Sequence, residues 1–266
     1  MSEFAHLTQG MTLHLTQLIP RLSCILVLLT ATLVLPLNPV AHSASAGDTQ
    51  PSSQLTDRQI IQGIDAAVLA RASAISRYTV QEHYSLYRNG EAKPSAEETI
   101  QTVYLRATGK EYTLISQSGS ALWRAEVIDK ILTGEKDLNL ANHREGAWIT
   151  SKNYEFRPEP GRVQLNGAQC IVVDLKPLRK SPHLFNGKIW IDASDYTVVR
   201  LQGIPSQSPS VLAGQALVSR EYIKIDGFSM ATHAEAHSHT FLFGDTLLKI
   251  DYSNYKIETA PPSTSP

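Results

Sequence analysis

The residues best suited to chemistry lie near the C-terminus, where His233, Glu235, His237 and His239 alternate with small side chains. If this stretch is a strand, all four side chains lie on one face, with neighbours about 7 Å apart. Histidine and carboxylate are ordinary zinc ligands, so a metal-dependent enzyme is one hypothesis. The spacing is wide for a single ion, and no cysteine joins the group. We therefore expect a polar outer strand face, with no metal and no cofactor.

Other catalytic patterns are missing from the sequence. It contains no Gly-x-Ser-x-Gly elbow, no His-Glu-x-x-His, no phosphate-binding glycine loop and no Cys-x-x-Cys. Glu97 and Glu98 adjoin each other in an expected loop, where solvation explains them better than acid–base catalysis does. Cys170 begins the apolar run Cys-Ile-Val-Val, which predicts a buried and unreactive thiol. We expect a protein that is not an enzyme.

The amino-acid composition argues against further classes of protein. The chain has 266 residues, of which 42% are hydrophobic and 18% charged, as in a folded globular protein with a sizeable core. Lys and Arg number 24 and Asp and Glu 25, giving a net charge of -1. This balance disfavours a nucleic-acid partner, because no excess of positive charge is available to neutralise phosphates.

The N-terminal segment has the order of a secretory signal. Arg21 precedes an almost wholly apolar run over residues 22–37, and Ala-Ser-Ala follows at 44–46. The alternative is a membrane anchor, but the run is about 16 residues, shorter than the roughly 20 that a spanning helix needs. We expect a signal peptide over 1–46, cleaved near Ala46, and a periplasmic protein. Composition predicts a flexible leader over 47–54 and a disordered tail over 259–266.

Periodicity predicts two helices and many strands. Apolar residues at helical spacing indicate a helix from Thr56 to about Arg77 and another from Ser120 to Leu132, which Gly134 could end. Alternating patterns predict strands over or near 78–87, 100–108, 112–117, 154, 167–175, 188–192, 196–202, 217–225, 230–243 and 246–257. Turn signals between them include Asn166-Gly167, Asn186-Gly187 and Asp226-Gly227.

These elements predict a mainly β fold of the α+β class. Short turns make neighbouring strands antiparallel, and twist curls a sheet of about ten strands toward a barrel. Amphipathic helices must bury their apolar faces, and the hollow of such a sheet is where they fit. We therefore expect a curved, half-open antiparallel barrel wrapped around two helices.

The same alternation yields candidates for the lining of an apolar cavity. They are apolar residues that share one side of their strand, with a tryptophan on the second helix as a lid: Val80, Tyr84, Leu86, Val103, Leu105, Ile189, Ile191 and Trp123. Ordinary core packing is the alternative interpretation for each of them.

The segment 175–192 reads Leu-Lys-Pro-Leu-Arg-Lys-Ser-Pro-His-Leu-Phe-Asn-Gly-Lys-Ile-Trp-Ile-Asp. With residues 195–200, 241–244 and 251–255, it resembles the bacterial outer-membrane lipoprotein-sorting proteins, the group around the carrier LolA, the acceptor LolB and the stress regulator RseB. The resemblance is best over 165–257. It implies a half-open antiparallel barrel around an apolar cavity that is plugged by helices and binds acyl chains.

Residues 55–258 are therefore expected to form a single LolA-like domain that binds a lipid or lipoprotein acyl chain. The leading hypothesis is an exported, monomeric, non-enzymatic binding protein, with a role in lipoprotein sorting or transport. A sensor or regulator of the same fold, with an envelope protein as partner, is the first alternative. The metal-dependent enzyme using the strand 233–239 is the second.

Overall fold

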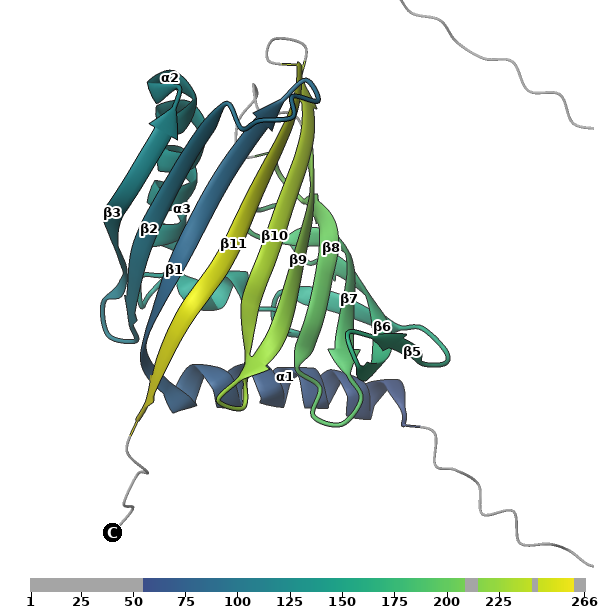
Figure 1. Ribbon diagram of the computed structural model, residues 1–266. Coiled ribbons are helices and arrows are strands. Elements are labelled where there is room, and N and C mark those ends of the chain that lie inside the picture. The colour runs from purple at the N-terminus through teal and green to yellow at the C-terminus, as the bar shows by residue number, and fades with distance from the viewer. Residues whose placement is uncertain (1–54, 209–214, 241–243, 261–266) are drawn as a thin grey trace, which may run out of the picture. The chain divides into compact units, whose positions relative to one another are not determined.

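The computed structural model describes residues 55–208, 215–240 and 244–260. They form one antiparallel sheet of eleven strands, which twists strongly from β3 to β5, with helices against it (Figure 1). Along the sheet the strand order is β3-β2-β1-β11-β10-β9-β8-β7-β6-β4, and β5 pairs with β6. The first and last strands of this order, β3 and β4, do not pair with each other within the described residues. The expected half-open antiparallel barrel with two helices is confirmed.

The strands extend or shift the predicted ones by a few residues. They are β1 (Ile75–Arg88), β2 (Ala96–Leu105), β3 (Gly109–Gly119), β4 (Tyr154–Pro158), β5 (Val163–Leu165), β6 (Ala168–Pro177), β7 (Phe185–Asp192), β8 (Val198–Pro205), β9 (Ala216–Ile225), β10 (Phe228–Thr240) and β11 (Gly244–Thr259).

Helix α1 (Asp57–Ala74) begins at a capping box, in which Thr56 and Gln59 bond to each other's backbone N–H groups. It runs across one end of the strands (Figure 1). The prediction that it reaches Arg77 is wrong, because Ile75 is buried and already pairs with Thr259 in the sheet. Pairing with β11 therefore decides where the helix stops.

The second helical segment consists of α2 (Ala121–Trp123), a π-helical turn η1 (Arg124–Ile128) and α3 (Asp129–Leu138). A short 3₁₀ helix, η2 (Arg144–Ala147), follows. Gly134 does not end the helix, contrary to expectation. Its backbone has no positive φ, and a helix accepts glycine at a modest cost in free energy.

One row of paired residues shows that the sheet has a single inner face. Directly paired residues of antiparallel strands share a side, so the row can be followed strand by strand from β6 to β2. It consists of Val173, Ile189, Leu201, Arg220, Ala234, Ile250, Tyr84 and Glu98. Both helices pack on this face. Two of its members are charged, which the alternation of apolar residues did not predict.

Two apolar clusters lie on the inner face. In the first, Ile60 and Ile64 of α1 pack against residues of β4, β6, β7 and β8. In the second, Ile128 and Leu132 pack against residues of β1, β2, β10 and β11. Each helix therefore covers its own part of the sheet.

Two of the predicted turns are confirmed by their backbone conformation. Asn166-Gly167 and Asp226-Gly227 have positive φ at both residues, as tight hairpins require. The turn expected at Asn186-Gly187 is wrong, because both residues lie inside β7, where Gly187 pairs with Gly203. Two glycines there let the backbones of β7 and β8 approach closely.

The expectations for the chain ends mostly fall outside the described residues. This holds for the signal peptide (1–46), the leader (47–54) and residues 261–266 of the tail. Thr259, placed in the tail, instead ends β11. Within 55–208, 215–240 and 244–260, no helix is both long and apolar enough to cross a bilayer.

Two alanine substitutions should have opposite effects. Gly134→Ala should stabilise the protein by about 0.5–1 kcal/mol, because the added methyl group meets no atom within 4 Å and the unfolded chain loses freedom. Gly187→Ala should destabilise it by more than about 1 kcal/mol, because the new Cβ would overlap the carbonyl oxygen of Gln202. Urea denaturation measures both; equal effects would contradict this account.

Candidate functional site

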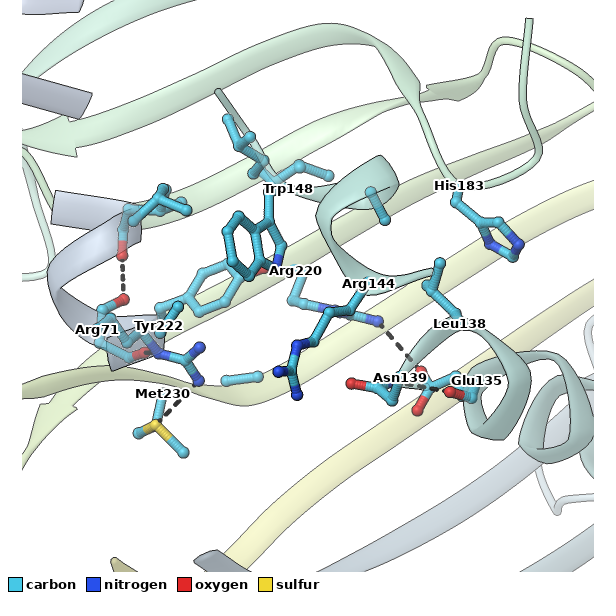
Figure 2. A pocket seen from close by; sticks show the side chains of 18 of the residues that line it. Arg71, Glu135, Leu138, Asn139, Arg144, Trp148, His183, Arg220, Tyr222 and Met230 are labelled. Carbon is cyan, nitrogen blue, oxygen red and sulfur yellow. Dashed lines mark hydrogen bonds and ion pairs between the residues drawn. The ribbon is translucent and has the colours of Figure 1, made fainter. Parts of the chain in front are cut away.

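A cavity of about 430 Å³ lies between α1, the C-terminal end of α3 with the loop that follows it, and the inner face of the sheet (Figure 2). Part of its wall is apolar, with side chains from α1, β1, β8, β10 and the 139–153 loop. These include Val68, Val80, Ile149, Val198, Leu201 and Met230. The size falls within the range of small-molecule sites, and an apolar wall is typical of them.

Aromatic side chains form much of the remaining wall, among them Tyr78, Trp148, Tyr154, Tyr252 and Tyr255. Burial raises the pKa of Tyr154 to about 12, and it also raises the pKa of Tyr78 and of Tyr252. These phenols therefore stay neutral and offer hydroxyl groups to the cavity. The hydroxyl of Tyr255 donates to the carbonyl of Ala231, 2.8 Å away.

A cluster of charges lies beside this apolar wall. Glu135 of α3 accepts a hydrogen bond from Nζ of Lys110 on β3 at 2.7 Å, and its other oxygen is 3.8 Å from Arg220 of β9. Burial by itself would raise the pKa of Glu135, but the two cations outweigh it and the pKa is lowered. Burial likewise opposes the charge of Lys110, yet Glu135 holds its pKa well above the ordinary value. All three groups are therefore charged at neutral pH.

Glu82 is the other carboxylate of the wall. It lies on β1 between Val80 and Tyr84 on the inner face, is 1% exposed, and accepts a 2.6 Å hydrogen bond from the Tyr84 hydroxyl. Burying a carboxylate is costly without such partners. The sequence analysis missed Glu82 because it assigned only apolar residues to the inner face. The alternation with Val80 and Tyr84 nevertheless places Glu82 on that face.

Three more basic side chains border the cavity. Nε of Arg71 donates to the carbonyl of Ser229 at 3.0 Å, and Nη1 of Arg144 donates to the hydroxyl of Tyr104 at 3.1 Å. Burial lowers the pKa of His183, so its imidazole is neutral at pH 7. The lining thus holds four cations, Arg71, Lys110, Arg144 and Arg220, against the two carboxylates.

The predicted site residues fall into four groups, and only Val80 lines this cavity. Tyr84 and Leu86 lie in the second apolar cluster, and Trp123 packs against that cluster. Ile189 and Ile191 lie in the first cluster, fully buried. The structure therefore does not bring the predicted residues together around one space, and Trp123 is not placed over the cavity as a lid.

The placement expected for Val103 and Leu105 is wrong. Val103 pairs with Thr79 and Leu105 with Arg77, so both lie on the outer face of β2, and Leu105 is 39% exposed. The inner face of β2 instead carries Glu98, Ile100 and Thr102, each less than 5% exposed. Alternation failed here because two of the inward positions are polar.

The histidine-rich strand has the predicted polar outer face. His233 lies 2.7 Å from Asp251 and 3.3 Å from Glu235, and His239 lies 2.6 Å from Asp245, while Ala234 faces inward. In the part of the chain that the structure describes, no three His, Cys, Asp or Glu side chains are grouped so that they could hold a metal ion. Cys170 is buried as predicted, and burial raises the pKa of its thiol.

Glu135→Gln should destabilise the protein by about 3 kcal/mol at neutral pH, because it leaves Lys110 buried without its charge partner. The pKa of Glu135 is lowered by folding, so its stabilisation is present at neutral pH and is lost as the pH falls through the folded-state pKa. The difference between wild type and variant should therefore shrink between about pH 7 and about pH 3. Denaturation at both pH values measures it; a constant difference would contradict this assignment.

Replacing His233, His237 and His239 together by Gln should change the free energy of unfolding by less than about 1 kcal/mol, as at other surface positions. Burial disfavours the charge of His233, but Asp251 and Glu235 outweigh it and its pKa is raised. A histidine whose pKa is raised by folding stabilises the fold at acidic pH, and this stabilisation is lost as the pH rises through the folded-state pKa. Any loss should thus be confined to acidic solution; unfolding with release of metal would refute this prediction.

Comparison with known proteins gives structural matches alone. No family model and no curated protein matches the sequence. Among solved structures, a LolA superfamily protein from Nitrosomonas europaea shares 10% identity over 78% of this chain and 96% of its own, with a TM-score of 0.42. A putative outer membrane lipoprotein-sorting protein domain from Vibrio parahaemolyticus shares 12% identity over 75% and 93%, with a TM-score of 0.44.

The MucA/MucB complex of Pseudomonas aeruginosa shares 10% identity over 76% of this chain and 98% of the matched chain, with a TM-score of 0.24. At TM-scores this low the likeness carries no inference about function.

Proposed function

We propose that this protein is a non-enzymatic binding protein whose cavity holds the acyl chain of a lipid or lipoprotein. The observation that carries the proposal is the cavity itself, with an apolar and aromatic wall between two separately packed clusters. Tyr154 and Leu201 of the first cluster border the space, as does Tyr252, which packs against the second, so the cavity lies where the two clusters meet. A preformed apolar space of this size is where a flexible chain leaves water.

The driving force would be burial of methylene groups. Each one removed from water contributes about 0.8 kcal/mol, so some ten of them contribute roughly 8 kcal/mol. Ordering the chain and losing its free translation offset several kcal/mol of this gain. The remaining gain of about 4–5 kcal/mol corresponds to dissociation constants of roughly 0.2–1 mM for the chain alone, which suit reversible binding.

The proposal includes the cell compartment and the extent of the domain. The signal-like segment 1–46 supports export to the periplasm, with residues 55–258 acting there as one monomeric domain. A role in lipoprotein sorting or transport would follow from reversible binding of acyl chains. No cofactor is needed for this function.

A sensor or regulator that passes on the bound state to an envelope protein is the second candidate. It is favoured by β3, at one end of the sheet order, where Leu114 and Ile115 are each 51% exposed. An edge strand with exposed apolar side chains can pair with an added strand. Capture of one envelope protein that Leu114→Lys abolishes would favour this candidate over a carrier.

Ala72→Trp tests the principal proposal, because Ala72 lines the cavity from α1 and an indole there would occupy the space for a chain. We expect the fold to persist and the binding of a fluorescent fatty acid to fall at least tenfold. Ala70→Trp is the matched control, since Ala70 lies two residues away on the exposed side of the same helix.

Lipid extraction and mass spectrometry complete the test, with wild-type protein purified without detergent. A co-purifying lipid that is absent from Ala72→Trp supports the proposal. Equal binding by wild type and both variants would show that the chain binds elsewhere and would refute it.

A further inference from the structure

The cavity carries more charge than the binding of an alkyl chain requires. Charged groups lose their hydration in such a space, so an apolar ligand alone gives no reason to place them there. Four cations border it against two carboxylates, although the whole chain has a net charge of -1. The positive charge is therefore concentrated in the cavity, and an anionic ligand group would compensate it.

Arg220 is only partly satisfied by the protein, through a hydrogen bond with the side chain of Tyr222 and a long contact to Glu135. It lies in the inner row between Leu201 and Ala234, so its neighbours on both adjacent strands are apolar. Its Nε is buried and has no hydrogen-bond partner among the described residues. The contact to Glu135 is 3.8 Å long, beyond hydrogen-bond distance, whereas Lys110 holds that carboxylate at 2.7 Å.

The side chain of Arg220 also remains accessible from the cavity. It keeps 35% of its surface exposed, against 12% for Lys110 and 18% for Glu135. Arg144 reaches the same space from the loop after α3, and Figure 2 shows both side chains among those that line it. Arg144 uses Nη1 for its bonds to Tyr104 and to the carbonyl of Arg106. Donors of both guanidinium groups are thus left for a ligand.

The apolar wall begins beside Arg220. Leu201, its direct neighbour on β8, lines the cavity together with Val198 of the same strand and Val68 of α1. A ligand with its charged end at Arg220 could therefore extend its chain toward α1 without leaving the cavity. The volume of about 430 Å³ is near the lower end for ligand sites, which favours one chain over several.

We propose that the cavity binds a single-chain amphiphile with an anionic head group, a carboxylate or a phosphate, which Arg220 and Arg144 hold while the chain lies along the wall toward α1. Guanidinium groups match both anions with paired, charge-assisted hydrogen bonds, which are stronger away from water. The inference rests on the proposed acyl-chain binding and adds the head-group chemistry to it. A cationic head group would meet the excess of positive charge and bind poorly.

The test compares ligands that share a dodecyl chain and differ in head group. Dodecanoate, dodecyl phosphate, dodecanol and dodecyltrimethylammonium are titrated by calorimetry, below micelle formation, with inorganic phosphate as the chainless anion. For the wild type we expect dodecanoate and dodecyl phosphate to bind at least tenfold more tightly than dodecanol. The cation and inorganic phosphate should bind more weakly still.

Arg220→Met should reduce the affinity for both anionic amphiphiles at least tenfold and leave that for dodecanol within about twofold. Methionine suits the apolar neighbours of Arg220, so the fold should survive; Arg144→Gln, in the loop, is a second variant with the same expected direction. Arg157→Met is the matched control, because Arg157 is exposed and pairs with Glu155 on the outside of β4.

Each further outcome decides one of the proposals. Equal binding of dodecanol and dodecanoate, unchanged in Arg220→Met, would overturn the head-group inference and leave acyl-chain binding standing. Inorganic phosphate binding as tightly as dodecyl phosphate would also overturn it, because the chain would then contribute nothing. If no dodecyl compound binds, both the head-group inference and the proposed function fail.

Discussion

A buried carboxylate joins the parts of this fold that surround the cavity. Glu135 on α3 bonds to Lys110 on β3, at one end of the sheet order, and faces Arg220 on β9, near its middle. The helix is thereby fixed to two strands that lie five places apart in the sheet. Removing one partner of such a buried pair leaves an uncompensated charge, so the three elements depend on one another.

The same cluster explains why a cavity exists between two well-packed regions. α1 fills the inner face over β4 and β6–β8, and α3 fills it over β1, β2, β10 and β11. The strand between them, β9, presents Arg220 on the inner face rather than an apolar side chain. Apolar side chains do not pack closely over a charged guanidinium group, so the two clusters stay separate and the space between them remains available to a ligand.

The sheet divides its charges between two faces with different consequences. On the outer face His233, Asp251 and Glu221 lie in one row of paired residues, where water screens them and each contributes little. On the inner face Glu82 and Arg220, together with Glu135 of α3, which faces Arg220, are shielded from bulk water, and their contacts affect both stability and the choice of ligand. Residue types alone do not distinguish the two groups, since both combine basic side chains with carboxylates.

The sequence alone determined the fold class. Period-two alternation and turns such as Asp226-Gly227 specify antiparallel strands locally, and Thr56 with Gln59 specifies the start of α1, because these signals depend only on residues close in the chain. Tertiary structure decided which strand face is inner and which polar residues it buries. Val103 was therefore assigned to the wrong face, and Glu82 and Arg220 were missed. An ion pair between residues more than twenty positions apart leaves no local pattern, and only the pairing of the strands and the docking of α3 bring its members together.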